Sequence, residues 1–498
     1  MSNSGLINQH KFFEEESKKY EQILEEYKKD KSKVFVDKNF HPTDDNIDNL
    51  DLFSPDEKVN NAQLTWKRID EVYTAPLFEK TKIHHLYIKQ GHLGDCYFIT
   101  ALSRIAKDSE LVPILFETGL PDQILGKVPN SINIKCGAVV IYFKVFGLRT
   151  PVLIDTRIPF KKSQPIFSRP IDLDKSPWFC LVEKAYAKLN GSYKNIKGGN
   201  FSESFYFLFG YYNKIFNPFT YSAENILKIL KYQKFGCLMD TSIKNATKIT
   251  DILDNFNLVK DHSYLIIKIR KYKETTFFFQ LRNPWGRKEW IGDYSKDSDL
   301  LKNDPELKEF LKEEQENGRF WIADKDYFKY FNKIEVSKPI NPYWITRAFC
   351  FPPTPTDDID KINPLEHPNF IFQLCNELDI GKKARFRIFV EKRNEEFSQI
   401  NMDNSRIYIL ACKNGGQKMK SSDLSKKNCA SSHHCISFSM KVLSKDDIVT
   451  FIVVHEAPPD VKSVFFVSVF CEYDFDLYDI NKPGDKISRS SETHGAVL

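Results

Sequence analysis

The sequence predicts an α+β protein: a two-part core, helical first and strand-rich second, followed by an antiparallel β-sandwich. Helical periodicity marks two segments of the first part, CYFITALSRIAKD from residue 96 and SPWFCLVEKAYAKLNG at 176–191. Beyond residue 230 the segments become short, rich in aromatic and β-branched residues and separated by turns, which indicates strands. From about residue 340 to 480 such strands continue at a spacing that is typical of an antiparallel sandwich.

The chain has 498 residues, enough for several domains that each bury a core. Residues 9–31 carry aromatic and aliphatic side chains at helical spacing among Glu and Lys, so we predict a helix that docks on the core, in preference to a dedicated partner motif. The predicted segments are an N-terminal helix and linker (1–62), a helical subdomain (63–199), a sheet subdomain (200–338), the β-sandwich (339–480) and a polar tail (481–498).

Composition and charge exclude several classes of protein. The 72 basic and 67 acidic residues leave a net charge of +5, which provides no strong field for nucleic acid. No segment approaches the roughly 18 uncharged residues that a membrane helix needs, and the N-terminal stretch has no signal-peptide pattern. The ten cysteines show no secreted-type framework, so we expect mostly free thiols and a cytoplasmic protein.

One cysteine stands out by its setting. In QGHLGDCYF (90–98), Cys96 follows Gly-Asp and opens an apolar helical pattern. A thiol is a strong nucleophile only as the thiolate, and a helix N-terminus or a neighbouring imidazolium lowers its pKa. A buried structural cysteine needs no such setting. Cys96 is therefore the candidate nucleophile.

The partners of such a thiol are a histidine and a polar group that orients it. His262 in DHSY stands at the start of a predicted strand, and Asn283 in RNPWG stands at the end of the next one. Adjacent antiparallel strands can hold these two side chains in contact. Each residue alone is explained as well by a structural role, but the three together favour cysteine-protease chemistry.

The blocks QGHLGDCYF, DHSY and RNPWG resemble the catalytic blocks of the calpain family of cysteine proteases. Similar segments follow in the same order: FVDKNFHP, TWKR, EKAYAKLNGSY and EWIGDYS. The resemblance covers about residues 20–335 and extends more weakly to about 480, and we expect no calcium-binding helix-loop-helix domain after it. It implies a papain-like two-subdomain core, a calpain-type β-sandwich and protein substrates.

The resemblance also implies roles for single residues. Cys96 would be the nucleophile, His262 the general base and Asn283 the residue that orients the base. The side-chain amide of Gln90 would donate to the oxyanion together with the Cys96 backbone N–H, where charge develops during acyl transfer.

Three further positions remain open between function and structure. Trp285 is similar to the family tryptophan that shields the catalytic pair, but simple core packing also explains it. Gly198 and Gly199 would let a substrate strand approach the backbone, although a plain turn explains them equally well.

The sequence departs from the family pattern beside the catalytic blocks. Tyr97 replaces a tryptophan, and Asp261-His262-Ser263 replaces Gly-His-Ala. Asp261 adds bulk and negative charge where the family glycine leaves room for a substrate backbone.

The resemblance further implies calcium, which binds each half of the core in animal calpains and needs several oxygen ligands per ion. Glu289 is retained, and Asp297 lies near another expected acid. Other expected acidic positions hold Tyr87, Ser176, Lys296, Asn317 and Arg319. We therefore expect no metal site of the familiar kind in the core, and the sequence requires no cofactor.

One other cluster has metal-capable side chains, formed by Cys429, His433, His434 and Cys435. Its spacing matches no common zinc pattern, so a surface loop is the favoured interpretation. The neighbouring loop CKNGGQKMKSSDLSKK holds five lysines and one aspartate, which leaves weak contact with an anionic membrane or an acidic partner as an alternative.

The sequence therefore predicts a calpain-like intracellular cysteine endopeptidase that hydrolyses peptide bonds through a Cys-His-Asn triad and an acyl-enzyme. The main alternative is a catalytically silent calpain-like binding or regulatory protein. The complete triad argues against that alternative, whereas Asp261 and the altered calcium positions argue for it. An acyltransferase on the same scaffold is a third hypothesis.

Overall fold

The computed structural model describes residues 18–40, 64–116, 134–145, 148–161, 163–216, 222–234, 236–244, 253–273, 275–312, 315–338, 345–351, 355–356, 363–379, 382–394, 406–420, 422, 429–432, 435–457 and 463–480. The chain divides into two compact units. The larger unit takes in residues 16–143 and 151–339, and the smaller one is built mainly from residues 340–498, with 144–150.

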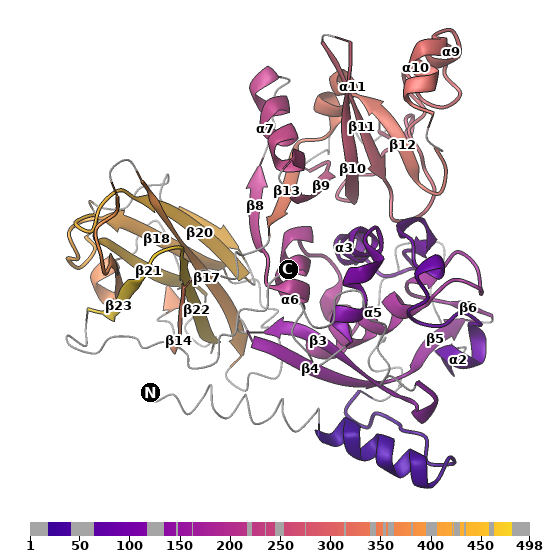
Figure 1. Cartoon of the computed structure of the whole chain (residues 1–498), viewed down its shortest axis with the longest axis horizontal. Coiled ribbons are helices and arrows are strands. Elements are labelled where there is room, and N and C mark those ends of the chain that lie inside the picture. Colours follow the sequence, from indigo (N-terminus) through magenta and orange to yellow (C-terminus); the bar gives the residue numbers. More distant parts are fainter. Residues whose placement is uncertain are drawn as a thin grey trace. The chain divides into compact units, whose positions relative to one another are not determined.

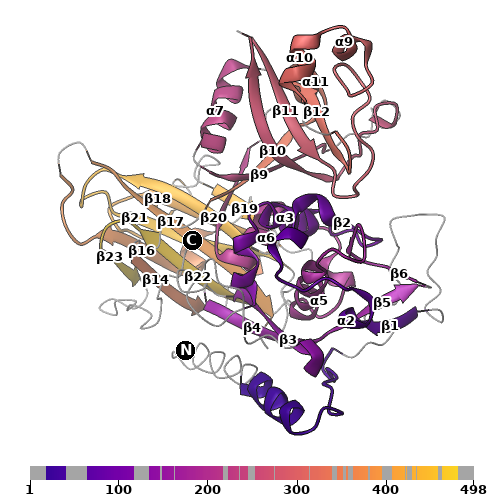
Figure 2. The ribbon, with the colours of Figure 1, turned by 45° about the vertical axis from the view of Figure 1, so that its right-hand side comes forward.

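The first half of the larger unit is built around buried helices (Figures 1 and 2). Every residue of α3 except Arg104 is buried, and so is every residue of α5 except Lys188, because apolar or small side chains surround both helices. The elements are β1 (Leu64–Arg68), α2 (Ile69–Val72), β2 (Ile88–Lys89), α3 (Cys96–Ala106), β3 (Ala138–Val145), β4 (Leu148–Asp155), β5 (Arg157–Lys161), β6 (Gln164–Pro165), β7 (Arg169–Pro170), α5 (Trp178–Leu189) and α6 (Phe201–Phe209), with single 3₁₀ turns between them.

The second half of the larger unit is a six-stranded sheet in the order β12-β11-β10-β9-β13-β8. Its neighbouring strands pair antiparallel wherever the register is given. The strands are β8 (Tyr212–Phe216), β9 (Leu238–Ser242), β10 (Ser263–Tyr272), β11 (Thr276–Arg282), β12 (Arg319–Ala323) and β13 (Lys333–Lys338). The helices are α7 (Ala223–Lys234), α9 (Asp299–Lys302), α10 (Pro305–Phe310) and α11 (Asp324–Tyr330).

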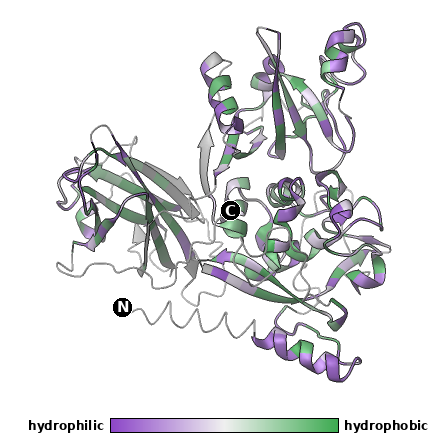
Figure 3. Ribbon diagram, in the orientation of Figure 1, coloured by the Kyte–Doolittle hydropathy of each residue, from purple (hydrophilic) through white to green (hydrophobic). Residues whose placement is uncertain are grey.

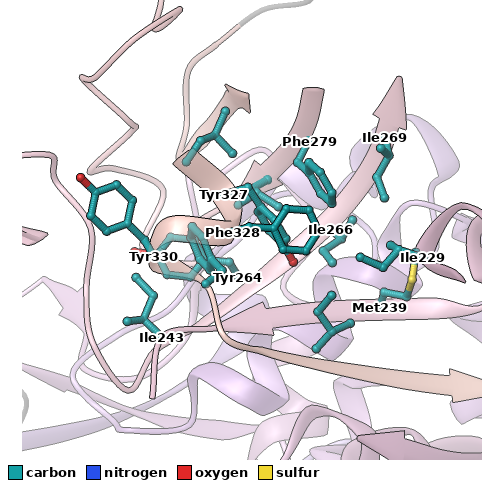
Figure 4. Close-up of a cluster of buried hydrophobic side chains, with 14 of the residues drawn as sticks. Ile229, Met239, Ile243, Tyr264, Ile266, Ile269, Phe279, Tyr327, Phe328 and Tyr330 are labelled. Carbon is teal, nitrogen blue, oxygen red and sulfur yellow. The ribbon is translucent and has the colours of Figure 1, made fainter. Parts of the chain in front are cut away.

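Side chains of this sheet alternate between two hydrophobic clusters, as the period of two in a strand requires. On β11, Phe279 packs with residues of α7 and α11, whereas its neighbour Phe278 packs with Leu301 and Leu307 of α9 and α10. Figure 4 shows the first cluster, in which the Phe279 and Tyr327 rings stack with their centroids 3.8 Å apart. Helices on both faces thus hold the sheet that carries His262 and Asn283 at one end.

The N-terminal helix docks on the core, as the sequence predicted. It runs through residues 18–29, with mainly hydrophilic residues and a few apolar ones (Figure 3). Four apolar side chains of this helix and Phe35 pack against a cluster that includes Val140 and Leu153 of β3 and β4.

The smaller unit contains two sheets with one shared hydrophobic cluster, and all their strand pairs are antiparallel except β15 with β21, which is parallel. The first sheet has the order β14-β22-β17-β20, the second β19-β18-β21-β16-β23 with β15 beside β21. Their bounds are β14 (Ile345–Phe351), β15 (Pro355–Thr356), β16 (Asn369–Leu374), β17 (Ala384–Asn394), β18 (Arg406–Lys413), β19 (Cys429–Ser432), β20 (Cys435–Val442), β21 (Val449–Glu456), β22 (Ser463–Cys471) and β23 (Phe475–Asp479).

Two general expectations can be compared with the described residues. No helix among them is long and apolar enough to cross a bilayer. The thiols of Cys96, Cys136, Cys180, Cys237 and Cys471 are free.

Candidate active site

Cys96 is the first residue of α3, as the sequence predicted, and only 8% of its surface is exposed. The residue before it, Asp95, is fully buried and makes no side-chain hydrogen bond to the first helical turn. The Phe98 N–H of that turn donates to the Asp95 backbone carbonyl at 2.8 Å, and the thiol lies at the N-terminal end of the helix.

His262 lies directly before β10, and Asn283 directly after β11. The two strands pair antiparallel, with Leu265 opposite Arg282, so both side chains lie at the same end of the sheet. His262 Nε2 and Asn283 Oδ1 are 2.8 Å apart, and both side chains are buried. The structure brings together these two residues of the predicted site.

The Asn283 carboxamide also determines which imidazole nitrogen can act as a base. Its Oδ1 accepts the backbone N–H of Trp285 at 3.0 Å, so this oxygen faces two donors and His262 Nε2 carries a proton. In the neutral ring, Nδ1 is then the basic nitrogen. It is buried without a hydrogen-bond partner, so its lone pair is available to accept a proton.

The thiol contacts the backbone of the residue that follows His262, across the two halves of the unit. His262 Nδ1 makes no hydrogen bond to the thiol, whose hydrogen-bond partner is the backbone of Ser263. Thr100 of α3 donates its hydroxyl to the Ser263 carbonyl at 3.4 Å. Residue 263 therefore connects the start of β10 to the helix of Cys96.

Gln90 lies in the loop between β2 and α3 with 4% of its surface exposed. Its Nε2 donates to the Leu93 carbonyl at 2.7 Å, and the same amide faces the Asp95 carboxyl. Its backbone N–H donates to the Pro284 carbonyl at 3.0 Å, across the two halves. The amide is thus held in the loop that leads to Cys96, and its role toward an oxyanion stays a prediction.

Burial dominates the electrostatics of the catalytic pair. It raises the pKa of the Cys96 thiol to about 11, and the hydrogen bond from Ser263 acts against this shift. It lowers the pKa of His262 to about 4, and the hydrogen bond to Asn283 acts against that shift. The sequence suggested a thiol pKa lowered by the helix N-terminus, but desolvation is the larger effect. Near neutral pH both groups are uncharged.

These pKa shifts predict how the thiol reacts with iodoacetamide. Because only the thiolate reacts, the rate at Cys96 should rise roughly tenfold per pH unit between pH 6 and 10 without reaching a plateau. Mass spectrometry of the peptide that contains Cys96 measures this rate, with Cys96→Ala as the control for other thiols. A plateau between pH 5 and 8 would contradict the prediction, because it would reveal a preformed thiolate–imidazolium pair.

The indole of Trp285 packs on the His262 imidazole, with 4.5 Å between ring centroids. This contact is compatible with both roles left open for Trp285, shielding of the Cys96–His262 pair and simple core packing.

Asp261 has φ = +51°, a left-handed conformation that aspartate tolerates better than most residues. Its exposed carboxylate lies 3.5 Å from Lys244 Nζ. The same backbone conformation explains why a glycine suits this position.

Gly198 and Gly199 are placed differently from each other. A Cβ at Gly199 would come within 2.5 Å of the Tyr97 ring, so this glycine leaves room for Tyr97. Gly198 has φ = +78°, donates its N–H to the Gly94 carbonyl at 2.9 Å and has open space where a Cβ would point. A turn that is tied to the nucleophile loop accounts for both positions.

Sequence reasoning missed a buried acid beside the catalytic pair. Asp240 of β9 is 3% exposed and accepts the Ser263 hydroxyl at 2.5 Å. Burial and the charge of Glu335 raise its pKa well above the usual range. An unusual aspartate in the predicted strand FGCLMDTSI was the available signal, but nothing in the sequence connected it to Ser263.

A second missed feature lies directly behind the nucleophile. Asp95 and Glu183 of α5 are both buried, and burial raises the pKa of each carboxyl, to about 7 for Glu183. The charge of Glu183 also raises the pKa of Asp95. Glu183 accepts hydrogen bonds from the Ser168 N–H and hydroxyl, whereas the Asp95 carboxyl faces the Gln90 amide. Asp95 and Glu183 therefore form a buried pair of interacting acids directly before Cys96 in the fold.

A third missed residue crosses between the halves. Arg282, the last residue of β11, is 1% exposed. Its guanidinium donates to Ser103 Oγ of α3 at 3.0 Å and to the Ile88 carbonyl of β2 at 2.5 Å. It stands directly before Asn283, so it fixes this strand end to the helix that carries Cys96.

The calcium positions, the Cys/His cluster at 429–435 and the lysine-rich loop before it are the other candidate sites. Among the described residues, no group of three His, Cys, Asp or Glu side chains is placed to hold a metal ion. His433 and His434 lie outside the described residues, as do the side chains of Cys429 and Cys435. Most of the second half of the lysine-rich loop also lies outside them, so a plain loop and a membrane contact both stay open.

The matching family model and the similar known sequences agree on one family. Residues 35–338, more than half of the chain, match the family described as calpain family cysteine protease. The human calpain-1 catalytic subunit is 29% identical over 312 residues, which cover 61% of this chain and 42% of that protein. Rat calpain-8 is 30% identical, and Caenorhabditis elegans calpain clp-4 is 31% identical; each match covers 55% of this chain and 38% of the relative. The chain thus spans about two fifths of the length of these relatives.

Proposed function

The chain belongs to the calpain family of cysteine proteases, and from this premise we propose that it is an intracellular cysteine endopeptidase with Cys96, His262 and Asn283 as its triad. The observation that carries the proposal is the 2.8 Å contact between His262 and Asn283 at the sheet end next to the Cys96 helix. Protein substrates and a cytoplasmic location are part of the proposal. So are a papain-like division at residues 63–199 and 200–338 and a calpain-type β-sandwich at 339–480.

The first chemical step forms an acyl-enzyme. His262 Nδ1 takes the thiol proton as Cys96 Sγ attacks the scissile carbonyl carbon. The Cys96 backbone N–H and the Gln90 amide donate to the developing oxyanion. The imidazolium, held by Asn283 Oδ1, then gives its proton to the leaving amine, the C–N bond breaks, and a thioester remains.

The second step regenerates the enzyme. A water molecule enters where the amine left, and His262 Nδ1 removes its proton as the oxygen attacks the thioester carbonyl. The C–S bond breaks, the carboxylic acid leaves, and the thiolate recovers the proton from the imidazolium. The neutral pair at Cys96 and His262 suits the two steps in which the imidazole accepts a proton, from the thiol and from water, because the base is uncharged when each of them begins.

Calcium, which the family resemblance implies, does not fit the residues at the expected positions of this core. The Tyr87 ring faces the Lys175 ammonium at 4.9 Å, and the Ser176 hydroxyl donates to the Leu77 carbonyl at 2.7 Å. Arg319 adds a cation to the second half. Glu289 keeps a carboxylate, but one of its oxygens accepts the Gly318 N–H at 2.7 Å. We therefore propose catalysis that does not depend on calcium in the core.

Covalent labelling tests this proposal. An epoxide-type thiol-protease probe should label Cys96 equally in calcium and in chelator, and labelling should disappear in Cys96→Ala and His262→Ala. Labelling only with calcium would show that other oxygen ligands form ion sites. A folded protein that is labelled under neither condition would favour the silent binding protein.

The two remaining candidate functions differ from hydrolysis in their products. A binding or regulatory protein would retain ligands without cleaving them. An acyltransferase would pass the acyl group to an amine, so adding an amine acceptor to a cleavage reaction and comparing hydrolysed with transferred product separates it from a protease. The contact between His262 and Asn283 favours catalysis over the silent binding protein, because binding alone requires no oriented imidazole.

A further inference from the structure

A run of basic side chains borders the catalytic pair on one side. It consists of Lys89, Arg169, Arg287 and Lys288, which we call the basic stripe. Lys89 and Arg169 lie opposite each other in the β2–β7 pair. The carbon chain of Lys89 crosses Gly286, where an added Cβ would lie 3.0 Å from Lys89 Cε. Turn and strand pairing thus gather basic side chains that the sequence holds far apart.

The other two members of the stripe follow Gly286 directly. Burial lowers the pKa of Arg169, and the positive charge of Arg287 acts in the same direction, so the two guanidinium groups are within electrostatic reach of each other. The Lys288 ammonium lies 5.8 Å from the centroid of the Trp285 ring, and its charge lowers the pKa of His262. Arg287 is exposed, and the other three side chains are half-buried. The stripe is therefore within electrostatic reach of the imidazole and open to solvent.

No carboxylate of the described residues forms an ion pair with any member of the stripe. Two acids beside the blocks of His262 and Asn283 have other partners: Asp261 lies 3.5 Å from Lys244, and Glu289 accepts the Gly318 N–H. Four cations gathered without a counter-ion repel each other. An acidic ligand would relieve that repulsion.

The chemistry of the pair determines which part of a substrate meets the stripe. His262 must give its proton to the leaving amine, so the residues after the scissile bond lie on the imidazole side. Trp285 packs on that imidazole, and Lys288 lies over Trp285. Lys89, which precedes Gln90, lies across the same turn. The C-terminal part of the substrate therefore leaves the site past the stripe.

We propose that the protease selects protein segments that carry acidic residues within the first few positions after the scissile bond, and that the basic stripe recognises them. This inference depends on the proposed function. Exposed ion pairs contribute little individually, so several together should favour Asp or Glu over Lys at these positions by roughly three- to tenfold in kcat/KM. The preference should weaken at high salt, because salt screens exposed charges.

The test maps cleavage sites in a peptide library by mass spectrometry, with the full-length protein at 50 mM and 500 mM salt. The first variant is Arg287→Glu/Lys288→Glu, which reverses two charges of the stripe. The matched control is Lys302→Glu/Lys308→Glu, which makes the same change of net charge on α9 and α10. We expect acidic enrichment after the cut in the natural protein and in the control, and its loss or reversal in the stripe variant.

Two results would overturn the inference. Cleavage with no acidic enrichment, or with enrichment that the stripe variant retains, would refute it while leaving the protease proposal intact. Absence of any cleavage, together with no probe labelling of Cys96, would refute the proposed function and this inference with it. Labelling thus separates the two failures.

Discussion

Replacing His262 by alanine is expected to lower kcat/KM by roughly 10³-fold or more, because the thiol loses its base and the leaving amine its acid. The remaining activity should rise with pH well beyond neutrality. In the variant only solvent removes the thiol proton, and burial holds the pKa of Cys96 at about 11. Steady-state cleavage of a fluorogenic peptide between pH 5 and 10 measures both effects.

The effects of replacing Cys96 and His262 on kcat/KM should not be additive. Cys96→Ala and Cys96→Ala/His262→Ala should be equally inactive, because the two residues act as one unit. The matched control is His84→Ala, which removes a half-buried imidazole that packs on Tyr87 rather than on the pair. Equal rates in His262→Ala and the natural protein would refute the assignment of His262 as base.

Much of the site could be predicted because its residues lie at element boundaries that the sequence marks. Cys96 is the first residue of a helix with a clear apolar pattern. Asn283 directly follows a strand, and Pro284 and Gly286 after it keep that strand from continuing. A histidine at the start of one strand and an amide at the end of its neighbour must meet if the strands pair antiparallel. The sequence therefore contains the information for the His262–Asn283 contact.

Contacts between residues far apart in sequence could not be predicted in this way. Asp240 accepts the Ser263 hydroxyl, and the charge of Glu183 acts on Asp95, only because tertiary packing brings separate elements together. The direction of the Cys96 pKa shift was missed for the same reason. A helix start is visible in the sequence, whereas the burial that outweighs it depends on the whole fold.

The second large expected effect is a loss of stability when Arg282 is replaced. This arginine is buried, and it has no carboxylate partner among the described residues. Burial lowers the pKa of Arg282 to about 9, and the charge of Arg319 acts in the same direction. The hydrogen bonds to Ser103 and Ile88 offset the cost of burying the cation. Arg282→Ala would leave both acceptors without their donor in a cavity, so we expect a loss of about 3 kcal/mol in the free energy of unfolding.

The position of Arg282 also predicts that Arg282→Ala loses reactivity at Cys96 before the protein unfolds. It holds the strand end before Asn283 against α3, so Arg282→Ala should lose probe labelling of Cys96 at temperatures where the protein is still folded. Arg282→Met keeps most of the side-chain volume without the hydrogen-bond donors, so it separates the effect of packing from that of hydrogen bonding.

Arg287→Ala, which replaces an exposed arginine five residues away, is the control and should change the free energy of unfolding by less than about 0.5 kcal/mol. Denaturant unfolding alongside labelling measures both properties. Unchanged labelling and stability in Arg282→Ala would show that the two halves are aligned by other contacts, such as those of Thr100 with Ser263 and Gln90 with Pro284.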